Sequence, residues 1–147
     1  MRVKGVHHIG IAVRDLEEAL KRWSALLGAE RSPVEELPER GVRLAHLRFA
    51  RGPEIELIAP LGDASPISKF LGSRGEGIQH LTLEVDDIEM AMDELSRAGL
   101  QFMSARPQAG SGGVRIAFVH PRSLNGVLVE IRQGRKSGAK KTSPADG

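Results

Sequence analysis

Residues 7–20 read HHIGIAVRDLEEAL, and residues 79–92 repeat the pattern as QHLTLEVDDIEMAM. At an offset of 72, eight pattern-bearing positions align and five of the eight pairs are identical. The eight positions in the first copy are His8, Ile9, Val13, Asp15, Leu16, Glu17, Ala19 and Leu20. Because self-similarity at a fixed spacing is typical of a duplicated structural unit, we expect two copies of one supersecondary structure.

A second aligned block extends the repeat toward the end of each copy. The matched segments are 42–45 (VRLA) with 114–117 (VRIA) and, after a two-residue loop difference, 55–57 (IEL) with 129–131 (VEI). Each copy therefore supplies one histidine, His8 or His80, and one glutamate, Glu56 or Glu130.

Within each copy the apolar periodicity changes from strand to helix. Alternating apolar positions at 6–13 and 78–85 predict two half-buried strands. A helix is predicted after each, with Asp15 and Asp87 as N-caps and Gly28 and Gly99 as stops. Further strands are predicted at 41–49, 54–59, 113–120 and 126–132, each set preceded by a weaker strand. The element order is βαβββ, twice, which is an α+β fold.

The repeats indicate one domain, residues 1–132, with copies at about 5–60 and 77–132. The linker, 61–76, contains Ser65 as a cap and Pro66 at the start of a short helix that is predicted to end at Leu71. A length of 147 residues suits a single domain. The absence of cysteine excludes disulfides, thiolate metal sites and a cysteine nucleophile. Because the apolar run at 9–13 is too short to span a membrane or serve as a signal, we expect a cytoplasmic protein.

The basic residues are unevenly distributed. The net charge is +2 at pH 7, and segment 133–147 carries four lysines and arginines against one acidic residue. Without that segment acidic residues slightly outnumber basic ones, and aromatic residues make up only 3% of the chain. We therefore expect no nucleic-acid surface. The segment is low in apolar residues, which predicts a disordered basic tail.

Strand alternation places the duplicated histidines and glutamates on one side of the sheet. His8 shares its side with Gly10 and Ala12, whereas the intervening isoleucines face the helix. The same alternation along their own strands places His80, Glu56 and Glu130 on that side of the sheet. Two halves related by a pseudo-two-fold axis would bring the four groups to a common ion, and such nitrogen and oxygen ligands suit Co, Mn, Ni, Zn or Fe(II).

The alternative is that each histidine is an ordinary half-buried residue and each glutamate simply faces solvent. For one isolated residue that interpretation is preferable. For the quartet it is not, because a carboxylate buried among apolar strand residues costs free energy unless a partner such as a metal compensates its charge.

These segments resemble the methylmalonyl-CoA epimerases of the vicinal oxygen chelate superfamily, from about residue 6 to residue 132. The resemblance is carried by HHIGIAV (7–13), LPERGVRLA (37–45), IELIAPLGDASPISKFL (55–71), GIQHLTLEVDDI (77–88) and HPRSLNGVLVEI (120–131). It implies a curved, partly open, barrel-like sheet of eight strands around a metal cavity. It also implies a divalent metal held by His8, Glu56, His80 and Glu130, with Co²⁺ first and Mn²⁺, Ni²⁺ or Zn²⁺ as alternatives.

The activity implied by the resemblance is interconversion of (R)- and (S)-methylmalonyl-CoA through a metal-stabilised enolate. Inversion needs an acid/base group on each face of the α-carbon, and Glu130 is one of them. Where one branch of the family has a glutamate, this chain has Leu44. His46, two residues on and on the same strand face, is the candidate for the second group, with an expected pKa near neutrality. An ordinary strand histidine is the alternative for His46. The expected partner is an acyl-CoA substrate, and the expected assembly is a homodimer.

Three further features are assigned structural roles. His7 has the opposite parity to His8 and is expected to pack or cap locally, and His120 is expected to end a strand. Residues 110–113 (GSGG) lack the lysine of a phosphate-binding loop, so a hairpin turn is predicted there.

Three rival functions remain. A glyoxalase I-like lactoylglutathione lyase uses the same ligand order, and a binding protein of the bleomycin-resistance type keeps the fold without needing the metal quartet. A ring-cleaving dioxygenase is disfavoured because Glu56 supplies a fourth ligand.

Overall fold

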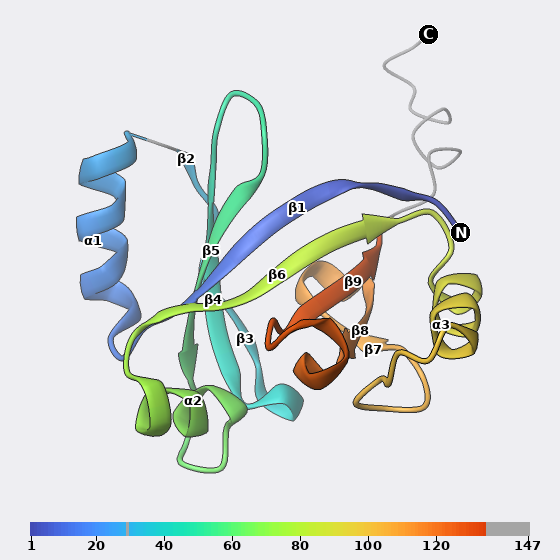
Figure 1. Cartoon of the computed structure of the whole chain (residues 1–147). Coiled ribbons are helices and arrows are strands. Elements are labelled where there is room, and N and C mark those ends of the chain that lie inside the picture. Colours follow the sequence, from blue (N-terminus) through green and yellow to red (C-terminus); the bar gives the residue numbers. More distant parts are fainter. Residues whose placement is uncertain (29, 135–147) are drawn as a thin grey trace, which may run out of the picture.

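Two long antiparallel strands, β1 (Val3–Ala12) and β6 (Gly77–Val85), join the two repeats at the centre of the molecule (Figure 1). They carry the first segment of each repeat, including His8 and His80. The computed structural model describes residues 1–28 and 30–134. Because the repeats meet at these strands, the duplicated histidines lie on neighbouring backbones.

The other strands extend the sheet outward on both sides. They are β2 (Glu30–Arg31), β3 (Glu35–Leu37), β4 (Val42–Arg48), β5 (Glu54–Pro60), β7 (Gln108–Ala109), β8 (Arg115–Val119) and β9 (Val129–Gln133). Their order is β2-β4-β5-β1-β6-β9-β8-β7, and β3 pairs with β4. In the first half β5 is parallel to β1, and in the second half β9 is parallel to β6. The two halves therefore have equivalent topology, as the duplicated sequence predicts.

The sheet curls into an open half-barrel, which confirms the α+β class and the double βαβββ order (Figure 1). The weaker strand of the first repeat is broken into two pieces, β2 and β3. A short 3₁₀ helix, η1 (Pro38–Arg40), follows β3. Two others, η2 (Ser111–Gly113) and η3 (Pro121–Leu124), flank β8 and make β8 and β9 shorter than predicted.

The helices begin where the sequence predicts. In α1 (Leu16–Leu27) the Asp15 carboxylate accepts a hydrogen bond from the Glu18 amide at 3.0 Å, and Gly28 follows in the left-handed conformation. In α3 (Ile88–Arg97) the Asp87 carboxylate accepts a hydrogen bond from the Met90 amide in the same way. α2 (Pro66–Arg74) is capped by Ser65 and runs three residues past the predicted end. α3 ends at Arg97, two residues before Gly99.

Three apolar clusters cover different parts of the sheet. One packs α1 on β1, β4 and β5, and another packs α3 on β8 and β9. The third packs α2 against the other side of the first half, where Ile67 and Leu71 meet Leu44 and Ile58. This leaves the middle of the concave face for polar side chains.

The last strand of the sheet ends one residue beyond the predicted domain boundary at residue 132. β9 continues to Gln133, whose side-chain oxygen accepts a hydrogen bond from the Ile88 amide at 2.9 Å. Residues 135–147 of the predicted tail lie outside the described residues. Among residues 1–28 and 30–134, no helix is long and apolar enough to cross a membrane.

Candidate metal centre

His8 and His80 point toward each other from the two central strands. Their Nε2 atoms are 3.2 Å apart, and the residues are only 4% and 3% exposed. His80 lies opposite Gly10 in the register of β1 and β6. A Cβ on Gly10 would overlap the His80 ring, so the glycine makes room for the imidazole.

Glu56 and Glu130 approach this pair from opposite halves. The Glu56 carboxylate lies 3.4 Å from Nε2 of each histidine. Glu130 Oε1 lies 3.5 Å from His8 Nε2 and 3.6 Å from His80 Nε2. Both carboxylates are buried. The structure therefore brings together all four side chains that strand parity placed on one face.

The donor set fits a divalent ion. Two donors that each lie about 2.0–2.2 Å from a shared ion, at roughly right to tetrahedral angles, are roughly 2.9–3.5 Å apart. The four spacings that His8 and His80 make with the two carboxylates, and the spacing between the imidazoles, agree with that range or come close to it. His8, His80 and Glu130 offer ligand atoms that all lie within 4.8 Å of one another. Glu56 does not join that mutual set, although it contacts both imidazoles.

The second ring nitrogen of each histidine is also engaged. His80 Nδ1 contacts the side-chain oxygen of Gln79, and His8 Nδ1 lies 2.8 Å from His7 Nδ1. Partners of this kind fix the tautomer and the orientation of a metal-binding imidazole. Both rings thus present Nε2 to the same place.

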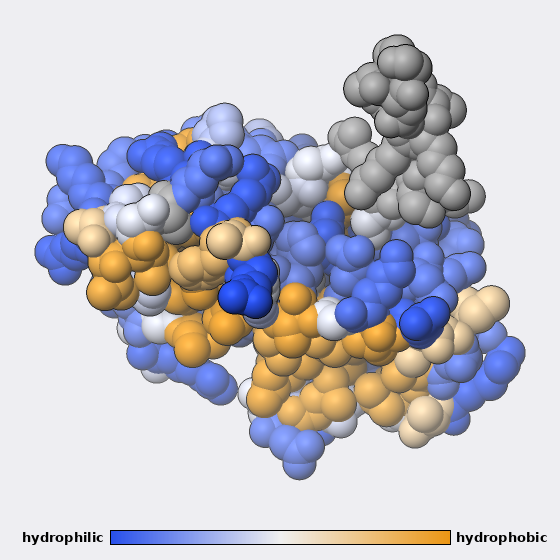
Figure 2. Space-filling model, turned by 90° about the horizontal axis from the view of Figure 1, so that it is seen from above, coloured by the Kyte–Doolittle hydropathy of each residue, from blue (hydrophilic) through white to orange (hydrophobic). Residues whose placement is uncertain are grey.

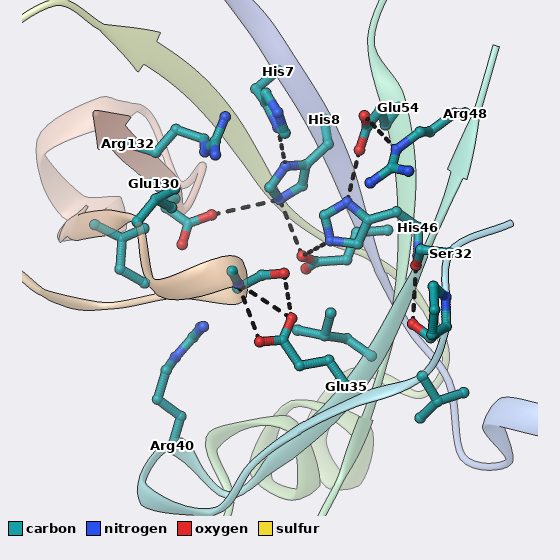
Figure 3. Close-up of a pocket in the computed structure, with 18 residues that line it drawn as sticks. His7, His8, Ser32, Glu35, Arg40, His46, Arg48, Glu54, Glu130 and Arg132 are labelled. Carbon is teal, nitrogen blue, oxygen red and sulfur yellow. Dashed lines mark hydrogen bonds and ion pairs between the residues drawn. The ribbon is translucent and has the colours of Figure 1, made fainter. Parts of the chain in front are cut away.

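The prediction for His7 was right about its local role but wrong about its direction. Val6 pairs with Leu83 and His8 pairs with Thr82, so His7 is an extra residue on β1, a β-bulge. The bulge interrupts strict alternation, and His7 lines the same cavity as His8 (Figure 3). Burial, with help from the charge of Arg132, lowers the pKa of His7 to about 4, so its ring is neutral.

Thr82 is a site residue that the sequence did not single out. Its hydroxyl donates a hydrogen bond to Glu130 Oε1 at 2.5 Å and lies 2.9 Å from His8 Nε2. Strand alternation places Thr82 on the same face as His80. Because threonine is common in strands, nothing in the sequence indicated that its hydroxyl would contact side chains of both repeats.

His46, which is on β4, lies beside the four candidate metal-binding side chains. Its Nδ1 is 2.7 Å from Glu54 Oε1, and its Nε2 is 3.1 Å from Glu56 Oε2 (Figure 3). That second contact falls outside hydrogen-bond geometry, so the buried Nε2 has no hydrogen-bond partner. Burial lowers the pKa of His46, but Glu54 and Glu56 outweigh burial and raise the pKa to about 9. In the metal-free chain these two carboxylates thus favour the protonated imidazole, and the pKa lies above the near-neutral value expected from the sequence.

The pKa shifts of Glu56, Glu130 and His80 are compatible with roles as metal ligands. Burial tends to raise the pKa of Glu56, but His46 and the neighbouring imidazoles hold it below its ordinary value. For Glu130 the contact with His8 likewise outweighs burial and lowers the pKa. Burial lowers the pKa of His80. Two ionised carboxylates thus lie beside a neutral imidazole.

A cavity of about 440 Å³ opens onto these groups. Leu44 reaches its wall, while also packing against α2. The turn at 110–113 joins β7 and β8 in a hairpin, as predicted. Ser111 Oγ and the Gly112 amide donate hydrogen bonds to the Glu35 carboxylate across the cavity (Figure 3). His120 lies beyond the end of β8 and accepts a hydrogen bond from the Arg122 amide, so it ends its strand as expected.

Most of the chain is similar to known proteins of one superfamily. Residues 7–118 match the glyoxalase/bleomycin resistance protein/dioxygenase superfamily. The chain is 39% identical over 130 residues to the ethylmalonyl-CoA/methylmalonyl-CoA epimerase of Cereibacter sphaeroides, covering 87% of this chain and 96% of that protein.

Two solved structures are similar over almost their whole length. The methylmalonyl-CoA epimerase of Mycobacterium tuberculosis superposes with a TM-score of 0.88 and 34% identity, covering 94% of this chain and 93% of that one. A variant of the Streptomyces coelicolor methylmalonyl-CoA epimerase in complex with 2-nitronate-propionyl-CoA gives 0.88 and 29% identity, covering 92% and 100%.

Proposed function

The chain belongs to the methylmalonyl-CoA epimerase family within the glyoxalase/bleomycin resistance protein/dioxygenase superfamily, and we propose that it interconverts (R)- and (S)-methylmalonyl-CoA. The observation that carries this proposal is the convergence of two buried imidazoles and two buried carboxylates, one of each from each repeat, beside a cavity that His8, Glu56 and Glu130 line. The likeness to epimerases over most of the chain favours this activity over a lyase or a binding protein.

His8, Glu56, His80 and Glu130 would hold one divalent metal ion. Nitrogen and oxygen donors of this kind are compatible with Co²⁺, which we place first, and with Mn²⁺, Ni²⁺ or Zn²⁺. When bound, the ion supplies Lewis acidity that stabilises negative charge on the thioester oxygen. The buried carboxylates gain a partner for their charge.

Glu130 and His46 are the proposed acid/base pair. They come from β9 and β4, in opposite halves, and face the cavity from opposite sides (Figure 3). A substrate α-carbon between them would lose a proton to one group and receive one from the other, which inverts the centre. His46 Nε2, which makes no hydrogen bond and lies 3.1 Å from Glu56 Oε2, is the atom available for that exchange. Leu44 lines the cavity but cannot transfer a proton.

We also propose a cytoplasmic homodimer. Several large apolar side chains are exposed on the single chain, and they include Val3, Val6, Ile78, Met90 and Val127. Seen from above, the apolar surface gathers along one side of the molecule (Figure 2). Exposed apolar surface of this kind favours association with a second copy. Light scattering coupled to size exclusion gives the subunit count.

One experiment separates the enzymatic candidates. The Co²⁺-loaded protein is incubated in D₂O with methylmalonyl-CoA, and separately with the methylglyoxal–glutathione hemithioacetal. We expect deuterium at the α-carbon and formation of the other enantiomer, with no lactoylglutathione. Turnover of the hemithioacetal alone would assign the chain to the lyases, and no turnover of either would favour a binding protein.

A further inference from the structure

Arg40 is a half-buried cation at the junction of two hollows on the concave face. It ends η1, between β3 and β4. Its side chain lines the cavity of the metal-binding residues and also a neighbouring cavity of about 590 Å³. In Figure 3 the Arg40 guanidinium points into the space below Glu130.

The surroundings of Arg40 place it close to the proposed metal. Its guanidinium carbon lies 5.6 Å from the centroid of the Phe118 ring, a cation–π contact. The Phe118 ring also meets the His80 ring edge-on, with centroids 6.2 Å apart. One aromatic ring therefore contacts both Arg40 and a proposed metal ligand.

Arg40 differs from the other cations of the cavity in having no acidic partner. Arg132 pairs with Glu84 at 2.7 Å, and Arg48 pairs with Glu54 at 3.2 Å. His46 faces Glu54 and Glu56. Within residues 1–28 and 30–134, Arg40 makes no ion pair and no side-chain hydrogen bond. Its planar guanidinium is the group best matched to a carboxylate, which it can bind through two parallel hydrogen bonds.

The charges expected in the occupied site favour a cation that can pair with the substrate carboxylate. Two ionised carboxylates, Glu56 and Glu130, would cancel the charge of a divalent ion. The proposed substrate brings a free carboxylate one carbon from its thioester, and proton removal adds further negative charge. Among the described residues that line the cavity, the other cations already have acidic partners, so Arg40 is the one available to the substrate.

We propose that Arg40 binds the free carboxylate of the acyl group and selects 2-carboxyacyl thioesters over acyl thioesters without that carboxylate. The proposal rests on the proposed function, because it assigns part of the same substrate to this residue. A purely structural alternative is that Arg40 braces the two halves through Phe118. That alternative predicts lower stability in variants but no change in selectivity.

The test compares two thioesters that differ only in the carboxylate. Calorimetry measures the affinity of the Co²⁺-loaded protein for malonyl-CoA and for propionyl-CoA. In Arg40→Gln we expect malonyl-CoA affinity to fall about 10- to 100-fold, the worth of a charged hydrogen-bonded pair, with propionyl-CoA affinity changed less than about twofold. Arg40→Lys keeps the positive charge but not the planar guanidinium, so its malonyl-CoA affinity should fall less than that of Arg40→Gln.

Arg97→Gln is the matched control. Arg97 is an exposed arginine of α3, with its side chain 72% exposed, and it pairs only with Asp93 within its own helix. Its removal changes the net charge by the same amount, so it corrects for the general attraction of the anionic coenzyme. We expect both affinities to remain unchanged.

The outcomes separate this proposal from the proposed function. An unchanged preference for malonyl-CoA in folded Arg40→Gln overturns the carboxylate role, even if epimerisation is normal in the wild type. A wild type that binds both thioesters equally also overturns it. Lost preference in Arg40→Gln supports the role, and deuterium exchange into methylmalonyl-CoA then decides the activity separately.

Discussion

Glu130 has two proposed duties, because its carboxylate is both a metal ligand and a proton acceptor. It is buried and hydrogen-bonded to Thr82, so an isosteric amide fits the same space. We predict that Glu130→Gln lowers epimerisation by at least the roughly 10²- to 10⁴-fold that general base catalysis contributes. The fold, followed by circular dichroism, should be intact. Normal activity would reject the base role, and a parallel Co²⁺ titration shows how much of the loss reflects weaker metal binding.

Substitution of His46 tests whether this residue is the second acid/base group. If Glu130 and His46 act on opposite faces, His46→Gln should abolish interconversion while one enantiomer still exchanges its α-hydrogen with D₂O at Glu130. Mass spectrometry measures the exchange, and chiral analysis measures the interconversion. His120→Asn is the control, since His120 lies outside the cavity and asparagine keeps a capping side chain. Unchanged interconversion in His46→Gln would point to another group or to water.

His7 should act through His8 rather than on substrate. Its Nδ1 is 2.8 Å from His8 Nδ1, so removing the contact frees the ligand ring to rotate or change tautomer. We predict that His7→Phe weakens Co²⁺ binding by about 10- to 100-fold, the usual effect of losing such a partner, and that His7→Asn loses less. Calorimetric metal titration is the measurement. Equal Co²⁺ affinity in His7→Phe would mean that the contact does not orient His8.

At the scale of elements, the pairing of β1 with β6 builds the centre of the site. The bulge at His7 sets the positions of His7 and His8, and Gly10 leaves room for the His80 ring opposite. Gly10 has an ordinary backbone conformation, so its small size, rather than an unusual φ, is what the position needs. The strands thus position the imidazoles through packing as well as through alternation.

Gly10→Ala should therefore damage the site more than the backbone. The new methyl group would overlap the His80 ring, and because that ring is fully enclosed it can move only by giving up its place near His8. We predict a loss of unfolding free energy of about 1–3 kcal/mol, typical of overpacking, together with weaker Co²⁺ binding.

Gly72→Ala is the matched control for that variant. Gly72 lies on the exposed side of α2, and apart from its chain neighbours and the adjacent helix backbone no atom lies within 4 Å of the place that the new methyl group would take. The same chemical change should therefore raise helix stability by about 0.5–1 kcal/mol. Chemical denaturation measures both variants. Equal effects at the two positions would contradict the packing role of Gly10.

At the scale of the whole molecule, the proposed metal is a link between the two repeats. Its ligands come from β1 and β5 in one half and from β6 and β9 in the other. We predict that free Co²⁺ at 100 times its dissociation constant raises the unfolding free energy by about 2.7 kcal/mol, because only the folded chain assembles the site. Chelation should reverse the gain and stop deuterium exchange.

Thermal or chemical unfolding with and without Co²⁺ checks this link. His8→Ala removes one ligand and should lose most of the shift. A wild type whose unfolding midpoint does not respond to any divalent ion would argue against a shared metal site. A response that survives in His8→Ala would place the ion elsewhere.

Much of this architecture was readable from local pattern. The repeat at an offset of 72 predicted equivalent halves, and capping residues such as Asp15, Asp87 and Ser65 predicted where helices begin. Alternation along strands placed His8, His80, Glu56 and Glu130 on one face. These inferences succeed because periodicity and caps depend on residues that are neighbours in the chain.

Other features depend on contacts between distant segments, and only the folded chain reveals them. The extra residue at His7 exists only relative to β6, the Thr82 hydroxyl meets His8 and Glu130 from separate strands, and the pKa of His46 is raised by glutamates on β5. The contact of Arg40 with Phe118 joins opposite halves. Register, burial and charge proximity arise when strands pair, so the order of residue types along one chain cannot specify them.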